Sequence, residues 1–193
     1  MQVKFKACGD YQTNCYIYDG FIIDPGVEAF VWVMENIKNP KAILLTHGHF
    51  DHIWSVKDLK DELNIPVYIH KNDAFMLEED IFNMNIPKTK ADFLVDEGDI
   101  KIDDKIVKFR HFPGHTPGCC VIEIDNIMFS GDFIFNGSIG RFDFPYSNQN
   151  EMKNSLKNFL TLNYDKIIYP GHGDITSIKE AQQNIKNYWL KVL

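Results

Sequence analysis

Three histidines and an aspartate lie within one segment of seven residues, THGHFDH (46–52), directly after the apolar run at residues 42–45. A short apolar run bounded by polar residues predicts a buried strand, so the histidines follow the end of a strand. His47 and His49 are two positions apart, and in an extended backbone both imidazoles can face one cation. Asp51 and His52 follow on a turn into a helix, where they can face a second position. The alternative interpretation is a polar loop without metal, since metal-type motifs produce false matches.

Three more candidate ligands follow other predicted strands. His115 lies in FPGHTPG (112–118), after a strand predicted at residues 106–109, and Asp132 lies in FSGD. His172 lies in YPGHGD, after a strand predicted at residues 166–169. Glycine in these turns lets the backbone approach a site closely. A single histidine of this kind is usually structural, but the joint occurrence with THGHFDH favours a metal site over packing.

Strands and helices alternate along the chain, which predicts an α/β fold of two sheets covered by helices. The first half has predicted strands at residues 3–6, 14–18, 21–23, 42–45 and 66–69 and helices at 27–38 and 53–63. Residues 72–93 are assigned to helix and loop. The second half has predicted strands at 101–102, 106–109, 120–124, 127–129 and 166–169. Two late helices have a cap residue followed by Glu three positions on, Asn148 with Glu151 and Ser177 with Glu180.

Length and composition set further bounds. The 193 residues contain no repeat and no Gly/Ser linker, so we expect one domain, 1–193. The net charge of −7 argues against nucleic acid as a partner. We find no signal peptide and no apolar run near the roughly 20 residues of a membrane span, so we expect a cytoplasmic protein without a membrane partner. Four cysteines without zinc-type spacing predict reduced thiols, and Cys119 and Cys120 are interpreted as buried hydrophobes rather than ligands.

The order THGHFDH, HTPG, SGD and PGHG resembles the metallo-β-lactamase superfamily over nearly the whole chain, including the DPG turn at residues 24–26 and EGD at 97–99. SGDFIF followed by GSIGRFDFP (137–145) is most similar to the glyoxalase II group, the hydroxyacylglutathione hydrolases, and especially to its short bacterial members. The resemblance implies a single-domain four-layer αββα sandwich that binds two metal ions. By this resemblance the first ion is held by His47, His49 and His115, the second by Asp51, His52 and His172, and Asp132 bridges the two.

The function implied is hydrolysis of a small-molecule thioester, such as S-D-lactoylglutathione, by attack of a metal-bridging hydroxide. Ligands of nitrogen and carboxylate without thiolate suit two zinc ions, with iron or manganese as alternatives. Asp51 is also a catalytic candidate, because it can orient the attacking water or accept its proton. Arg141 is a candidate for binding a substrate carboxylate, and the alternative is a pair with Asp143 that shapes the loop. Two departures concern the substrate: Asp143 stands where larger relatives have an aromatic residue, and their extra helical domain has no counterpart here.

A second chemistry fits the same residues. GRFDF (140–144) also resembles the GR(T/S)DF stretch of persulfide dioxygenases, which oxidise glutathione persulfide with one iron. Here that iron would be held by His47, His115 and Asp132. Phe142 stands where that group has Thr or Ser, which favours the hydrolase. Hydrolysis of β-lactams or lactones and cleavage of RNA are less favoured activities of the superfamily.

Overall fold

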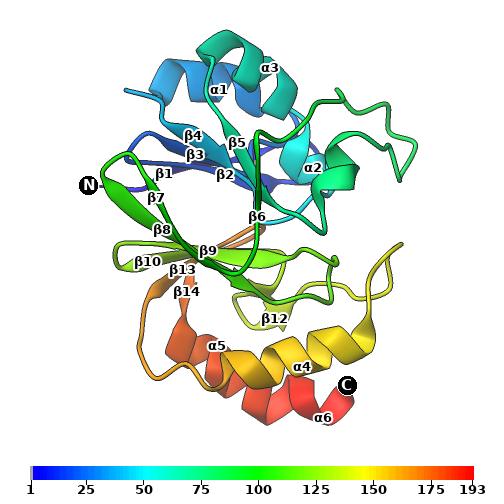
Figure 1. Cartoon of the computed structure of the whole chain (residues 1–193). Helices are drawn as coiled ribbons and strands as arrows, with labels where there is room; N and C mark the ends of the chain where they lie inside the picture. Colours follow the sequence, from blue (N-terminus) through cyan, green and yellow to red (C-terminus); the bar gives the residue numbers. More distant parts are fainter. Residues whose placement is uncertain (1) are drawn as a thin grey trace. The chain divides into compact units, whose positions relative to one another are not determined.

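The computed structural model describes residues 2–193, and contacts between Cα atoms divide the chain into two compact units, Met1–Asp96 and Glu97–Leu193. Each unit contains one six-stranded β-sheet with helices on a face of that sheet (Figure 1). The α/β class predicted from the sequence is confirmed. That residues 1–193 form one domain stays a prediction.

The sheet of the first unit has the strand order β1-β2-β3-β4-β5-β6. Its strands are β1 (Lys4–Cys8), β2 (Thr13–Tyr18), β3 (Phe21–Ile23), β4 (Ala42–Leu44), β5 (Val67–His70) and β6 (Phe93–Val95). β1, β2 and β3 form antiparallel hairpins, whereas β3 to β6 pair in parallel. Parallel pairing requires crossovers, which here contain α1 (Ala29–Asn36), then α2 (Phe50–Ile53) and α3 (Val56–Leu63).

The parallel pair of β3 and β4 brings two loops together. Ile23 pairs with Leu44 at the ends of these strands, and the backbone N–H of Asp24 donates to the carbonyl of Leu44 at 3.2 Å. The carboxyl ends of both strands therefore lie at one edge of the sheet. The DPG turn and the histidine segment begin side by side at this edge.

An apolar core joins this sheet to its helices. Val56 and Leu59 of α3 are fully buried and are three residues apart, which places them on one face of the helix. They belong to one cluster with Ile43 and Ile69 of the sheet and Val33 of α1. Burial of this cluster fixes the helices on the sheet and so fixes the loops between them.

The sheet of the second unit has the order β14-β13-β10-β9-β8-β7. Its strands are β7 (Gly98–Ile102), β8 (Lys105–His111), β9 (Cys120–Ile124), β10 (Ile127–Gly131), β13 (Ile167–Pro170) and β14 (Thr176–Ser177), and β11 (Ile134–Phe135) with β12 (Ser138–Ile139) forms a small separate hairpin. Among the strands described in this sheet, β10 and β13 form the only parallel pair, and the other neighbours pair antiparallel. The N–H of Gly171 donates to the carbonyl of Gly131 at 2.8 Å, so Asp132 and His172 follow adjacent strand ends.

Both predicted helix caps of the second unit are present. Asn148 Oδ1 accepts from the N–H groups of Asn150 (2.9 Å) and Glu151 (3.1 Å) at the start of α4 (Gln149–Phe159). Ser177 Oγ accepts from the N–H of Glu180 at 3.2 Å. The last helix runs as α5 (Ile178–Asn184), a π-helical turn η2 (Ile185–Trp189) and α6 (Leu190–Val192), where the sequence predicted one regular helix.

Several short elements were not predicted. The segment assigned to helix and loop contains only the 3₁₀ helix η1 (Ala74–Leu77), and it ends in β6. β11, β12 and β14 have two residues each, which is too short for a detectable alternation of apolar and polar residues. β6 has the sequence Phe-Leu-Val, and two of its three side chains are exposed. It therefore lacks the buried apolar run by which a strand is recognised in a sequence.

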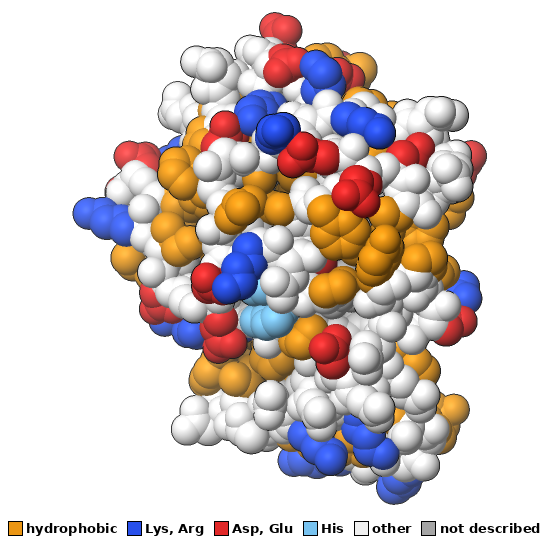
Figure 2. Space-filling model, turned by 45° about the vertical axis from the view of Figure 1, so that its right-hand side comes forward, with side chains coloured by type: hydrophobic (Ala, Val, Ile, Leu, Met, Phe, Trp, Pro, Cys, Tyr) orange, Lys and Arg blue, Asp and Glu red, His pale blue; other side chains and the backbone are white. Residues whose placement is uncertain are grey.

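Surface and thiol properties agree with the composition. All four cysteines are buried as thiols, and burial raises the pKa of the Cys15 thiol well above its ordinary value. No helix within residues 2–193 is long and apolar enough to cross a membrane. The face seen in Figure 2 carries both cationic and anionic side chains, so it is not uniformly basic.

Candidate metal centre

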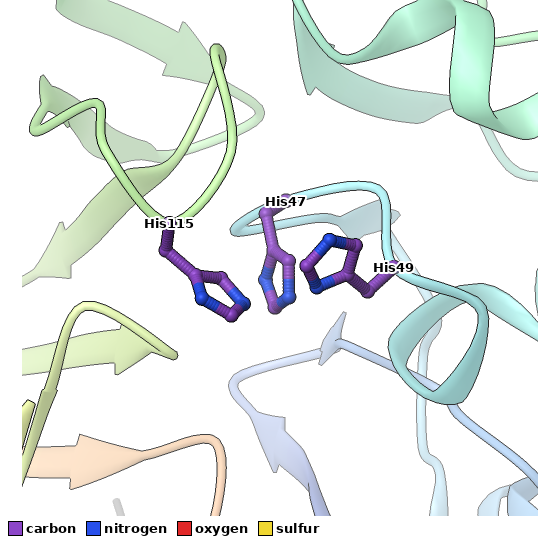
Figure 3. Close-up of side chains that lie close together, drawn as sticks. All are labelled: His47, His49 and His115. Carbon is purple, nitrogen blue, oxygen red and sulfur yellow. The ribbon is translucent and has the colours of Figure 1, made fainter. Parts of the chain in front are cut away.

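The first unit gathers the three histidines of THGHFDH at the end of β4. The ring centroids of His47 and His49 lie 4.9 Å apart, and both imidazoles point to the same side of the loop (Figure 3). His49 has extended backbone angles and is the N-cap of α2, whose first turn carries Asp51 and His52. The ring of His52 lies 4.1 Å from that of His47. His49 thus has the extended backbone expected of it, whereas Asp51 and His52 lie within the short helix α2, ahead of the helix predicted at residues 53–63.

Asp24 lies beside His47 and His52, although the sequence motif identified it only as part of a turn. Its carboxylate accepts from the N–H of Thr46 (2.8 Å), from Thr46 Oγ1 (2.6 Å) and from Nδ1 of His52 (3.0 Å). Asp24 is 2% exposed and has a left-handed φ of 48°. Because these donors belong to Thr46 and His52, Asp24 connects the DPG turn to the histidine segment.

The hydrogen bonds at Nδ1 determine which ring nitrogen faces outward. Thr46 gives its one hydroxyl proton to Asp24, so it accepts from Nδ1 of His47, 3.0 Å away. Nδ1 of His52 likewise donates to Asp24, and Nδ1 of His115 donates to the backbone carbonyl of Arg141 at 2.7 Å. Each of these three imidazoles therefore presents Nε2 with its lone pair. Metal-ligating histidines have this arrangement, in which an oxygen acceptor holds the other ring nitrogen.

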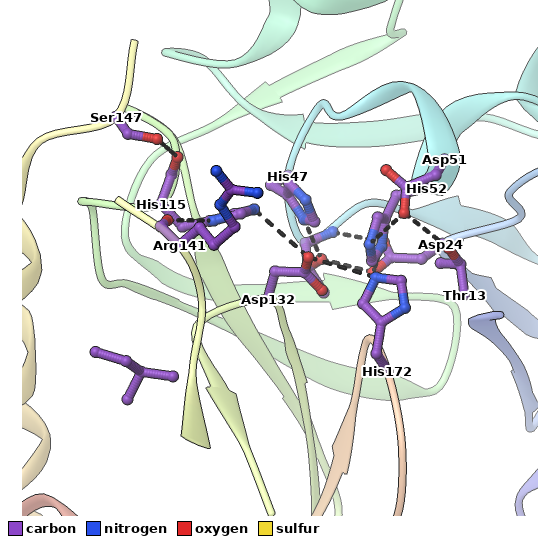
Figure 4. A network of polar contacts seen from close by, with 12 residues as sticks. Thr13, Asp24, His47, Asp51, His52, His115, Asp132, Arg141, Ser147 and His172 are labelled. Atoms are coloured by element: carbon purple, nitrogen blue, oxygen red, sulfur yellow. Dashed lines mark hydrogen bonds and ion pairs between the residues drawn. The ribbon is translucent and has the colours of Figure 1, made fainter. Parts of the chain in front are cut away.

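The second unit places Asp132 between two histidines. Nε2 of His115 and Nε2 of His172 each lie 3.5 Å from Oδ2 of Asp132 (Figure 4). In the first unit, Nε2 of His52 lies 3.5 Å from Oδ2 of Asp51. Two ligands at about 2.1 Å from a tetrahedral cation are about 3.4 Å apart, whereas N–H···O hydrogen bonds cluster near 2.9 Å. All three pairs thus have the spacing of ligands on a shared cation, and the donor set fits a divalent metal.

Asp24 is close enough to be considered as a ligand itself. Its ligand atoms and those of His47 and His52 lie within 4.8 Å of one another. However, the two oxygens of Asp24 already accept three hydrogen bonds from Thr46 and His52. We therefore assign Asp24 to holding the imidazoles rather than to binding a cation.

Two further polar groups that the sequence did not reveal support the same loops, the buried Asp73 and the half-buried Ser147. Asp73 Oδ2 accepts from the N–H of Gly48, between His47 and His49, at 3.1 Å. Ser147 Oγ donates to the carbonyl of His115 at 2.6 Å. Asp73 comes from a segment with no recognisable motif, and serine is common in loops, so neither carried a signal in the sequence.

The backbone of Gly26 lies directly against the histidine segment, at Asp51 and His52. A Cβ at this position would overlap the carbonyl oxygen of Asp51. We expect Gly26→Ala to lower the free energy of unfolding by about 1–3 kcal/mol, as overpacking does, and to reduce metal content by displacing Asp51 and His52. Urea denaturation of the metal-free protein and elemental analysis measure the two effects.

Gly137→Ala is the matched control for this substitution. A Cβ at Gly137 meets nothing within 4 Å, but its φ of 78° is left-handed. We expect a loss of about 1 kcal/mol from the backbone conformation and no change in metal content. Equal metal content in both variants would show that contact with the Asp51 carbonyl is unimportant for the site.

Arg141 is paired with Asp143, as one of the two interpretations predicted. Nε and Nη2 of Arg141 donate to the two oxygens of Asp143, both at 2.9 Å, and the guanidinium lies 4.2 Å from the ring centroid of Phe144. The hydrogen bond from Arg141 lowers the pKa of the Asp143 carboxyl. A guanidinium has five N–H donors, of which this pair uses two. Binding of a substrate carboxylate by Arg141 stays a prediction.

The remaining two histidines have local contacts. Nε2 of His111 lies 2.8 Å from the carbonyl of Pro117. Nδ1 of His70 accepts from the N–H of Asn72 at 3.3 Å. Both histidines therefore contact backbone groups of their own loops.

Comparison with known proteins places these loops in a family. The model of the metallo-β-lactamase superfamily matches residues 8–172. Hydroxyacylglutathione hydrolase GloC of Haemophilus influenzae is 36% identical over 205 aligned residues, which cover 95% of this chain and 96% of the relative.

Two solved structures have the same fold. The structure described as BLEG-1 B3 metallo-β-lactamase superposes with a TM-score of 0.87 and 32% identity, covering 98% of this chain and 99% of that one. The structure of TTHA1623 in a di-iron-bound form gives a TM-score of 0.78 and 32% identity, covering 90% of this chain and 94% of that one. The fold predicted from the sequence motifs is confirmed.

Proposed function

The chain belongs to the metallo-β-lactamase superfamily, and we propose that it is a binuclear metal-dependent hydrolase that cleaves the thioester of S-D-lactoylglutathione or of a related hydroxyacyl thiol. The observation that carries this proposal is the set of three imidazoles whose Nδ1 groups are held by oxygen acceptors, so that each presents Nε2. The proposed enzyme acts on a small molecule in the cytoplasm, without a nucleic-acid or membrane partner.

Seven side chains make up the proposed ligand set. We assign one cation to His47, His49 and His115, the other to Asp51, His52 and His172, and both to Asp132. The order of the motifs supports the assignment, and so does the 3.5 Å spacing of Asp132 from His115 and His172. Two zinc ions suit these ligands, and iron or manganese are the alternatives. When bound, two such cations lower the pKa of water toward neutrality and polarise a carbonyl oxygen.

The chain's own residues have separate parts in the proposed reaction. Asp24 and the Arg141 carbonyl hold the imidazoles in one tautomer, and Asp51 orients the attacking water or accepts its proton. A C–O bond forms at the thioester carbonyl, the C–S bond breaks, and a thiolate leaves. A thiol pKa of about 8.5 makes this leaving group stable without a general acid. A metal-replete Asp51→Asn variant with near-normal turnover would contradict the role of Asp51.

The names of two related proteins point to different substrates for this chain. The name of GloC supports a hydroxyacylglutathione thioester, whereas BLEG-1 is described as a β-lactamase and supports a β-lactam as the second candidate. We prefer the thioester because the SGDFIF and GSIGRFDFP segments resemble the hydroxyacylglutathione hydrolases. Both reactions add water to a carbonyl, so they use the same ligands and differ in the substrate contacts.

One panel of assays on the metal-loaded protein tests the proposal. S-D-lactoylglutathione, a chromogenic cephalosporin and glutathione persulfide with dissolved oxygen are compared at equal enzyme concentration. We expect kcat/KM for the thioester to exceed that for the cephalosporin by at least about a hundredfold, with no oxygen uptake. Faster cephalosporin hydrolysis would favour the β-lactamase, and oxygen uptake with persulfide would favour the dioxygenase.

Arg141 allows a test of substrate recognition. We expect Arg141→Met to raise KM for S-D-lactoylglutathione about tenfold with kcat unchanged, because an exposed charge-assisted contact is worth roughly 1 kcal/mol or slightly more. Asp143→Asn is the matched variant, since it removes the anionic charge from the same pair but keeps the cation. We expect its KM to stay the same or fall. Equal changes in both variants would show that Arg141 serves only to shape the loop.

A further inference from the structure

Thr13 contacts the metal-binding segment from a distant part of the sequence. Its Oγ1 donates to Oδ2 of Asp51 at 2.7 Å, and its side chain is buried, with 1% of the residue exposed (Figure 4). Thr13 is the first residue of β2 and pairs with Cys8 at the end of the β1–β2 hairpin. The hairpin therefore fixes the backbone from which this hydroxyl reaches Asp51.

The same oxygen of Asp51 also has the position of a metal ligand. Oδ2 lies 3.5 Å from Nε2 of His52, which is the ligand spacing described above. An aspartate carboxylate rotates easily about its Cβ–Cγ bond, because torsions of this type have broad minima. A hydrogen bond from a fixed hydroxyl to one oxygen restricts that rotation. Threonine suits this position because its β-branch restricts χ1.

We propose that Thr13 is a positioning residue that holds Asp51 with Oδ2 toward the cation shared with His52. This inference rests on the proposed function and extends it to a residue outside the ligand motifs. The hydrogen bond and the proposed metal contact involve the same oxygen, because Oδ2 both accepts from Thr13 and faces Nε2 of His52.

Metal binding by two Thr13 variants tests this inference without relying on turnover. Thr13→Val keeps the size and the β-branch but removes the hydroxyl, whereas Thr13→Ser keeps the hydroxyl. We expect Thr13→Val to bind one of two Co²⁺ ions about 10–100-fold more weakly, which is the usual effect of losing a group that holds a ligand. Competition with a chelator, followed through the visible spectrum of Co²⁺, measures each binding step. Thr13→Ser is expected to restore the affinity to within about threefold.

A matched control separates this effect from the general loss of a buried hydroxyl. Thr176 is 5% exposed, and its Oγ1 donates to Oε2 of Glu180 at 3.0 Å, outside the proposed ligands. We expect Thr176→Val to bind both Co²⁺ ions like the wild type. Urea denaturation of all three variants in the metal-free state checks that each one folds.

The outcomes separate this inference from the proposed function. Unchanged affinity in Thr13→Val, or an equal loss in Thr13→Ser, would overturn the role of Thr13 and leave the hydrolase proposal intact. Two Co²⁺ ions without thioester hydrolysis in the wild type would overturn the proposed substrate alone, and the Thr13 comparison would still apply. Binding of a single Co²⁺ with no weaker second step in the wild type would contradict both.

Discussion

Replacing Asp132 by alanine is expected to remove at least one of the two metal ions and to lower kcat/KM for the thioester by at least about a thousandfold. Oδ2 of Asp132 is equally distant, at 3.5 Å, from Nε2 of His115 and Nε2 of His172, so the substitution removes the group that both histidines share. A cation contributes several kcal/mol to the transition state, and each 1.4 kcal/mol or so is a factor of about ten in rate. Elemental analysis and steady-state kinetics measure the two losses.

Asp104→Ala is a suitable control for the Asp132 variant. Asp104 is an exposed residue in the turn between β7 and β8 of the same unit. We expect it to keep the wild-type metal content and turnover. An Asp132→Ala protein that still held two metals and turned over normally would show that this carboxylate is not a shared ligand.

Asp24→Ala is expected to weaken binding of both metals and also to destabilise the metal-free protein. The Asp24 carboxylate accepts from two donors of Thr46 and from Nδ1 of His52, and Thr46 in turn holds His47. Loss of the carboxylate frees the tautomers of His47 and His52, so we expect metal affinity to fall about 10–100-fold at both positions. The donors left buried lower the free energy of unfolding by about 3 kcal/mol.

Two separate measurements check the Asp24 prediction. Urea denaturation of the metal-free protein gives the stability, and chelator competition gives the affinity at each binding step. Asp10→Ala, an exposed substitution in the β1–β2 turn, is expected to change neither. A variant that lost affinity in only one step would show that Thr46 holds His47 without help from Asp24.

Fold elements with a strong apolar pattern or a cap signal were predictable from the sequence. β3 and β9 have the predicted bounds, and α4 begins at the predicted cap Asn148. The π-helical turn Ile185–Trp189 was not predictable, because the apolar spacing there also fits a regular helix. The short strand β6 is defined by pairing with β5 and not by its own residues, two of which are exposed.

The candidate ligands were predictable from the sequence, whereas the residues that hold them were not. Histidine and aspartate in glycine-rich turns after strands are conspicuous in a sequence. Asp24 and Thr13 act through contacts with segments 22 and 38 residues away, which no local pattern reveals. The DPG motif already explained Asp24 as a turn residue. Its hydrogen bonds to Thr46 and His52 were therefore not expected from the sequence.

The loop that contains Arg141 is the part of the site for which the sequence left two interpretations open. Arg141 has the pair with Asp143 and the contact with Phe144 that shape its loop, and its backbone carbonyl also holds His115. Arg141 thus contacts the candidate ligand His115 through its backbone carbonyl and presents an exposed guanidinium through its side chain. This connection makes the Arg141 and Asp143 variants informative about substrate, while Asp132 and Asp24 report on metal.

The most direct test of the central claim is the metal content of protein purified without added metal, measured by elemental analysis beside an assay of S-D-lactoylglutathione hydrolysis on the same sample. The proposed binuclear hydrolase predicts about two divalent ions per chain and thioester turnover that is lost on chelation and restored by the metal found. One iron per chain, no hydrolysis, and oxygen uptake with glutathione persulfide would contradict it.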